Sequence, residues 1–194
     1  MNDSISAPAL PLHPPSRSIV LVGLMGAGKS SVGRRLAGRL GLPFVDADNE
    51  IEAAAGCSIE EIFSRHGEAA FRDGERRVIM RLLDGPTHVL ATGGGAFMDA
   101  ATRAKIRACA TAIWLKADLD VLVKRCGRRP SRPLLKQEDP RSVLERLMRE
   151  RHPIYAEADI TVDSGDQPHE QVVESIVRRL AETSTPVAAA GVAP

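Results

Sequence analysis

A short apolar strand that runs directly into a glycine-rich loop is the feature that most constrains this chain. Residues 18–22 read Ser-Ile-Val-Leu-Val, a continuous run typical of a strand buried on both faces. The next residues, Gly23-Leu-Met-Gly-Ala-Gly-Lys-Ser30, match G-x-x-x-x-G-K-[ST] and lead into an amphipathic segment at 29–40. Strand, loop and helix follow in the order that this phosphate-binding motif requires, which predicts an α/β domain that binds a nucleoside triphosphate.

Each residue type in the loop has a physical role. Glycine at positions 23, 26 and 28 permits a positive φ and lets backbone N–H groups approach phosphate oxygens. The helix N-terminus adds positive potential, and Lys29 places a charge on the β- and γ-phosphates. The Ser30 hydroxyl is a predicted Mg²⁺ ligand. ATP or GTP with Mg²⁺ is therefore expected on Gly26, Ala27, Gly28, Lys29, Ser30 and Ser31.

Apolar runs alternate with amphipathic segments along the rest of the chain. Strands are expected at 18–22, 43–46, 88–92, 111–115 and 159–162, and helices at 29–40, from 48, from 58, at 67–83, after 99, at 118–126, to about 155 and from about 167. This pattern predicts an α/β fold with a five-stranded parallel sheet and helices on both faces. We expect a single domain at 17–182, with disordered tails rich in Pro and Ala at 1–16 and 183–194. Ligands of such a sheet bind at the carboxyl ends of its strands.

Composition disfavours several classes of partner. The 26 basic and 25 acidic side chains give a net charge of +1, and there are only six aromatic residues, so neither nucleic acid nor a membrane is expected as a partner. The three cysteines have no metal-site or disulfide spacing and are interpreted as reduced thiols in the cytoplasm. No membrane span, secretory signal or sustained heptad pattern is recognised, and we expect a monomer.

An acidic pair after the second expected strand narrows the class of phosphoryl transfer. Asp46 and Asp48 are alternate residues, so one can face the metal while the other faces a substrate hydroxyl. The alternative is a pair of ordinary turn carboxylates, with Asp48 as a helix N-cap. The chain lacks the NKxD base-reading motif of GTPases and is short for a helicase. A small-molecule kinase fits these features.

With its later motifs the chain resembles the shikimate kinases, P-loop enzymes that transfer the γ-phosphate of ATP to the 3-hydroxyl of shikimate. The resemblance covers Ile19 to about Leu180. It rests on an ordered set of motifs: Gly23 to Ser31, Phe44-Val-Asp46-Ala-Asp48 with Ile51-Glu52, Ser58-Ile-Glu-Glu-Ile-Phe63, Gly67-Glu68, Phe71-Arg72, Gly93-Gly-Gly95, Arg132-Pro-Leu134 and Arg151-x-Pro153-x-Tyr155. It implies a nucleoside-monophosphate-kinase-like fold with a mobile lid and a role in aromatic amino-acid biosynthesis.

The resemblance also implies which residues bind shikimate and catalyse the reaction. Shikimate binding falls to Asp48, Arg72, Gly93, Gly94, Gly95 and Arg151, and catalysis to Lys29, Asp48 and Arg132. These residue types suit a ligand with one carboxylate and three hydroxyls, because arginine binds a carboxylate in a bidentate manner and Asp48 accepts from a hydroxyl. Asp46 would reach Mg²⁺ through water. Glu75 has two interpretations, a partner of the hydroxyls or of an arginine, or a surface i, i+3 ion pair.

The basic stretch from Lys124 to Arg132 contains too many Gly and Pro residues for a helix and is interpreted as part of a mobile lid at about 124–140. By resemblance Arg132 lies over the ATP phosphates and Arg125 near the adenine or the base of the lid. Gln167 stands where the family has an adenine-stacking arginine. A related gluconate kinase and a regulatory module without catalysis are the alternatives. The intact Lys29, Asp48 and Arg132 argue against the second.

Overall fold

The computed structural model describes residues 15–127 and 139–184. Arg132, most of the expected lid and almost all of both expected tails lie outside these ranges. Within them, no helix combines the length and the apolarity needed to cross a membrane. The elements are β1 (Ser18–Val22), α1 (Lys29–Leu40), β2 (Phe44–Asp46), α2 (Ala47–Ala55), α3 (Ile59–Leu83), β3 (Val89–Ala91), the 3₁₀ turn η1 (Ala96–Met98), α4 (Ala100–Cys109), β4 (Ala110–Lys116), α5 (Leu119–Cys126), α6 (Pro140–Tyr155), β5 (Ile160–Asp163) and α7 (His169–Ser184).

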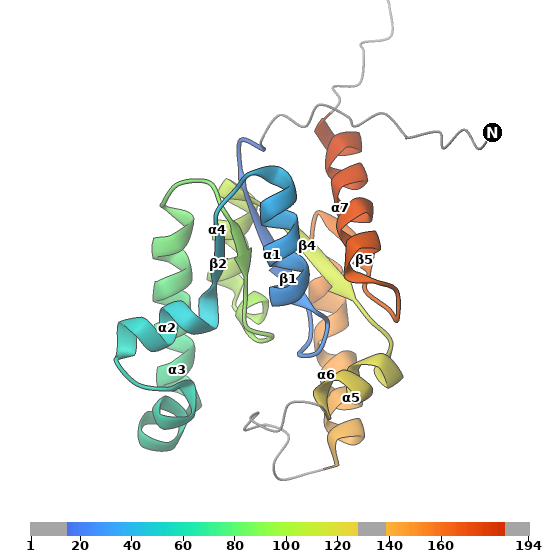
Figure 1. Ribbon diagram of the computed structural model, residues 1–194. Coiled ribbons are helices and arrows are strands. Elements are labelled where there is room, and N and C mark those ends of the chain that lie inside the picture. Colours follow the sequence, from blue (N-terminus) through green and yellow to red (C-terminus); the bar gives the residue numbers. More distant parts are fainter. Residues whose placement is uncertain (1–14, 128–138, 185–194) are drawn as a thin grey trace, which may run out of the picture.

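The five strands form one parallel sheet, as predicted, and their order is β2-β3-β1-β4-β5. The register places Leu21 of β1 beside Ala91 of β3 and Ile113 of β4. Helices α1 and α7 lie side by side on one face of the sheet, and α4 lies on the other (Figure 1). The chain passes from β1 to β2 on one side of the sheet and later crosses from β3 to β4 on the other side of β1. The loop after β1 therefore lies at the switch point where such sheets bind ligands.

Close packing fixes the elements that carry this loop. Every residue of β1 is buried, as the continuous apolar run predicts. Gly33 brings α1 against β2, since a Cβ at this position would lie 2.6 Å from Cε2 of Phe44. Across the sheet, the ring of Tyr155 in α6 packs 5.9 Å from Trp114 in β4 and 6.5 Å from Phe97 in η1, measured between ring centroids.

Several element boundaries differ from the sequence prediction. The two helices expected after residue 58 are both present within α3, and Gly67, whose φ of 77° and ψ of 176° are not helical, separates them where the second was expected to begin. The capping box of Ser58 and Glu61 begins this helix as predicted. Helix α2 begins at Ala47, and its N-cap is Asp46 rather than Asp48. Helix α7 begins two residues later than expected, at His169, and continues to residue 184, inside the segment expected as a tail.

Candidate active site

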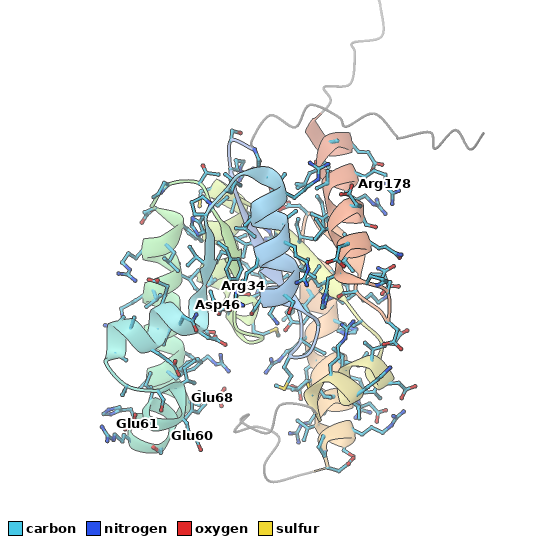
Figure 2. All side chains as sticks on the ribbon, viewed as in Figure 1. Arg34, Asp46, Glu60, Glu61, Glu68 and Arg178 are labelled. Atoms are coloured by element: carbon cyan, nitrogen blue, oxygen red, sulfur yellow. The ribbon has the colours of Figure 1, made fainter. Side chains whose placement is uncertain are left out.

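A cavity of about 410 Å³ lies at the carboxyl ends of the strands. Figure 2 shows Asp46 at this end, where β2 meets α2, and Glu68 on helix α3. The cavity is lined by Gly26, Gly28, Lys29, Ser30, Ser31, Asp46, Asp48, Thr92, Gly93, Gly94, Arg125, Cys126, Gln167, Pro168 and His169. Most of the residues predicted from the sequence to hold nucleotide and acceptor therefore share one cavity.

The phosphate-binding loop has the backbone that its glycines predict. Gly23, Gly26 and Gly28 have φ values of 137°, 82° and 90°, a region that side chains disfavour. A Cβ at Gly23 would also lie 2.7 Å from the carbonyl oxygen of Leu115. The Lys29 ammonium donates to the carbonyl oxygens of Gly23, at 2.7 Å, and of Leu24, at 2.9 Å. These bonds hold the lysine charge against the loop, which lines the cavity.

Ser30, in the first turn of α1, and Asp46, at the end of β2, present two hard oxygen atoms that are hydrogen-bonded to each other. The Ser30 hydroxyl donates to Oδ2 of Asp46 at 2.7 Å, and Oδ1 of Asp46 accepts from the backbone N–H of Asp48 at 3.2 Å. No group of three His, Cys, Asp or Glu side chains that could hold a metal ion is found within 15–127 and 139–184. Two oxygen ligands without a full protein cage suit Mg²⁺, which commonly keeps waters and binds substrate phosphates.

Both predicted carboxylate-binding arginines contact the glycine loop that follows β3. Arg72 of α3 pairs with Glu75 at 2.7 Å and with Glu68 at 3.1 Å. Its guanidinium packs so closely on Gly95 that a Cβ there would collide with it. Arg151 of α6 donates from Nη1 to the Gly94 carbonyl oxygen at 2.9 Å. A second cavity, of about 300 Å³, is lined in part by Arg72, Gly95 and Arg151.

Glu75 is 2% exposed, so its interpretation as a surface ion pair is wrong. Only Oε2 is paired, with Arg72; Oε1 is buried and has no hydrogen-bond partner among the described residues. A Cβ at Gly93 would lie 2.6 Å from this Oε1 and 3.2 Å from Oδ1 of Asp48. Burial raises the pKa of Glu75, and the negative charge of Asp48 adds to the rise, whereas Arg72 and Arg151 oppose it.

The far end of the first cavity is formed by the chain between β5 and α7. Arg125 joins this segment to the phosphate-binding loop by donating to the carbonyl oxygens of Gly26, at 3.3 Å, Ser164, at 2.9 Å, and Gly165, at 2.5 Å. Gln167 lines the cavity and donates from Nε2 to the Asp163 carbonyl oxygen at 2.7 Å. The neighbouring His169 also lines the cavity, and burial, with the charges of Arg35 and Arg125, lowers its pKa.

Comparison with known proteins gives the family. The shikimate kinase family model matches residues 25–181. The chain belongs to the shikimate kinase family. It is 62% identical over 165 residues to a shikimate kinase of Bradyrhizobium diazoefficiens, covering 85% of this chain and 80% of the relative. It is 63% identical over 164 residues to that of Paramagnetospirillum magneticum, covering 84% of each chain.

Solved structures agree with this family. The shikimate kinase from Acinetobacter baumannii in complex with shikimate superposes with a TM-score of 0.85 at 35% identity, covering 88% of this chain and 96% of that one. A gluconokinase from Sinorhizobium meliloti superposes with a TM-score of 0.55 at 20% identity, covering 88% and 98%. That second likeness shows the shared fold alone.

The structure adds four cavity-lining residues to those predicted from the sequence. It also divides the residues expected in one site between two cavities. Thr92, Cys126, Pro168 and His169 line the first cavity and were not predicted. Thr92 directly follows β3 and precedes the predicted glycine loop, so its position beside a strand end was the signal available for it. Ala27, within the phosphate-binding loop, is buried and does not line the first cavity, while Arg72, Gly95 and Arg151 line the second cavity.

Proposed function

We propose that the protein transfers the γ-phosphate of ATP to the 3-hydroxyl of shikimate, giving 3-phosphoshikimate and ADP for aromatic amino-acid biosynthesis. One observation carries the proposal. A phosphate-binding loop, an aspartate and a glycine loop share one cavity, and two arginines lie against that glycine loop. The relative from A. baumannii was solved in complex with shikimate, and its fold covers 88% of this chain.

The nucleotide end of the site binds phosphate through backbone and lysine. N–H groups of Gly26 to Ser31 and the Lys29 ammonium would hold the ATP phosphates, supported by the positive end of α1. Ser30 would bind Mg²⁺ directly and Asp46 through water, because both present oxygen atoms at the start of α1. When bound, Mg²⁺ neutralises charge on the β- and γ-phosphates. Arg125 and Gln167 are proposed at the nucleoside end.

The acceptor end binds a carboxylate and hydroxyls. Arg72 and Arg151 would hold the carboxylate, since their planar forks give two parallel, charge-assisted hydrogen bonds. Backbone N–H groups of Gly93 to Gly95 would add further donors. Asp48 would orient the 3-hydroxyl and accept its proton as the phosphorus–oxygen bond forms. Of the roles open to Glu75, orientation of Arg72 is supported by the 2.7 Å ion pair in a buried position.

Arg132 is the remaining proposed catalytic residue, and its role comes from the family resemblance. An arginine over the transferring phosphate would stabilise the charge that develops there. We propose a cytoplasmic location, supported by the three free cysteines, which a reducing compartment keeps as thiols. A monomer remains our expectation.

A coupled assay of ADP release tests the proposed function. The full chain is incubated with MgATP and either shikimate or gluconate at matched concentrations, and the product is identified by mass spectrometry. We expect turnover with shikimate and little with gluconate, because gluconate lacks the rigid ring that sets the distance between carboxylate and reacting hydroxyl. Absence of turnover with shikimate, or preference for gluconate, would contradict the proposal.

A further inference from the structure

Two fully buried hydroxyl groups bond to the backbone of the two ligand-binding loops. The Tyr155 hydroxyl donates to the carbonyl oxygen of Gly94, in the glycine loop after β3. The Ser164 hydroxyl donates to the carbonyl oxygen of Ala27, in the phosphate-binding loop, at 2.7 Å. Both side chains are 0% exposed, so neither can touch a ligand itself. One bond lies at the acceptor end of the site and the other at the nucleotide end.

Each bond fixes the plane of one peptide group. A trans peptide is planar, so the carbonyl of one residue and the N–H of the next point in opposite directions. The described residues contain no cis peptide bond. Holding the Gly94 carbonyl therefore aims the N–H of Gly95, and holding the Ala27 carbonyl aims the N–H of Gly28.

The two N–H groups are available to ligands. Among the described residues, neither the Gly28 N–H nor the Gly95 N–H donates to another protein group. Gly28 lines the first cavity and Gly95 the second. Glycine allows the backbone many conformations, so without an external bond these peptides would lose orientation. An N–H donor binds an anionic oxygen well only when it is already aimed at it.

We propose that Tyr155 and Ser164 are positioning residues, one for each ligand: Tyr155 aims the Gly95 N–H at the acceptor, and Ser164 aims the Gly28 N–H at the nucleotide phosphates. The assignment of Tyr155 to the acceptor rests on the proposed function, whereas that of Ser164 needs only a bound nucleotide.

The surroundings of each hydroxyl support this division. Arg151, one turn before Tyr155 on α6, donates to the same Gly94 carbonyl oxygen, so acceptor-binding arginine and glycine loop are joined at one atom. Burial raises the pKa of Tyr155, although Arg151 opposes the rise, and the phenol stays protonated as a donor. At the other end, the backbone oxygen of Ser164 accepts from Arg125, which also bonds to the phosphate-binding loop.

Two single-atom deletions test the proposal by their separate effects on the two ligands. Tyr155→Phe retains the packed aromatic ring and Ser164→Ala retains the buried Cβ, so each variant removes only a hydroxyl group. The dissociation constants for shikimate and for MgADP are measured by calorimetry on the full chain. We expect Tyr155→Phe to weaken shikimate roughly threefold to tenfold and Ser164→Ala to weaken MgADP by a similar factor, each leaving the other ligand within about twofold.

Ser18→Ala is the matched control. In the wild type, the buried Ser18 hydroxyl accepts from the backbone N–H of His88 at 3.2 Å. This bond lies at the amino ends of the strands, whereas the cavity lies at their carboxyl ends. The variant should lower the thermal midpoint without changing either dissociation constant. If both test variants weaken both ligands equally, or neither ligand is weakened, the proposal is wrong.

A measurement without shikimate separates this proposal from the proposed function. In amide NMR spectra of the ligand-free protein, Tyr155→Phe should shift the Gly95 signal and Ser164→Ala the Gly28 signal, each more than the other variant does. If wild-type protein fails to bind shikimate but these shifts appear, the proposed function is wrong and the positioning roles stand. If the shifts are absent in both variants, the positioning roles are wrong.

Discussion

The two halves of the site are built by different means. The part of the nucleotide half proposed to bind phosphate is one continuous stretch, residues 23–31, and most of its proposed ligand-binding groups belong to the backbone. The acceptor half collects side chains from α2, α3 and α6 around a glycine loop, and its side-chain groups carry charge. Backbone donors need only correct loop geometry, whereas the charged groups depend on buried partners such as Glu75. Substitutions in the acceptor half should therefore change acceptor binding and leave nucleotide binding nearly intact.

The largest expected effect is that of Asp48→Asn. The amide keeps the shape of the carboxylate but cannot accept the proton of the acceptor hydroxyl, so kcat should fall by about 10²- to 10⁴-fold. The dissociation constant for MgATP should change by less than about twofold, because Asp48 lies at the acceptor end. Steady-state kinetics and nucleotide calorimetry check this. Asp120→Asn, at a side chain 81% exposed in an ion pair with Arg141, is the control. Full activity of Asp48→Asn would remove this residue from the chemistry.

The sequence predicts each half of the site to a different extent, because one half is built from neighbouring residues and the other from residues far apart in the chain. The phosphate-binding loop is local, so its motif, the strand before it and the helix after it suffice to predict its conformation. The acceptor residues are far apart in sequence, and their meeting around the glycine loop was inferred from family resemblance. The burial of Glu75 was open, because its i, i+3 spacing from Arg72 is equally typical of a solvated helix face. Thr92 had a usable signal, its position at the end of an expected strand, whereas the position of His169 depends on tertiary packing that no local pattern encodes.

The next largest effect is expected for Arg72→Lys. This variant tests whether acceptor binding requires the planar guanidinium group or only a positive charge. Lysine keeps the charge but cannot bind a carboxylate through two parallel bonds, so the KM for shikimate should rise about 10- to 100-fold. The KM for ATP should stay within about twofold. Gly95→Ala should produce the same pattern, since its Cβ would displace the Arg72 guanidinium. Arg77→Lys, on the same helix with a side chain 74% exposed, is the control. Equal rises in both KM values would show that the halves are not separable.

Glu75→Gln should have a smaller effect with a distinctive pH dependence. The amide oxygen still accepts from Arg72, so we expect the KM for shikimate to rise only about threefold to tenfold. Since the pKa of Glu75 is raised in the folded state, the native protein binds more protons than the unfolded chain above the ordinary value of 4.5. The contribution of Glu75 to stability is therefore complete below about pH 4.5 and is lost as pH rises through the folded pKa.

Chemical denaturation across pH tests that sign. The free energy of unfolding of Glu75→Gln, relative to wild type, should increase as pH rises from about 4.5 through the raised pKa. Glu68→Gln is the matched control, because Glu68 pairs with the same arginine while its side chain is 59% exposed. A relative stability that decreases over this range would mean that the ion pair with Arg72 outweighs burial.

The smallest expected effect marks the boundary of the acceptor half. Gly74 lies in α3 between Arg72 and Glu75, yet a Cβ at this position would meet nothing within 4 Å. Alanine there should stabilise the helix by up to about 1 kcal/mol and raise the thermal midpoint by about 2–4 °C, without changing either KM. Calorimetry and kinetics on the same preparation check both results. A raised KM for shikimate would instead show that this helix must flex at Gly74 for the acceptor to bind. Both halves would then rely on glycine, one for loop shape and the other for motion.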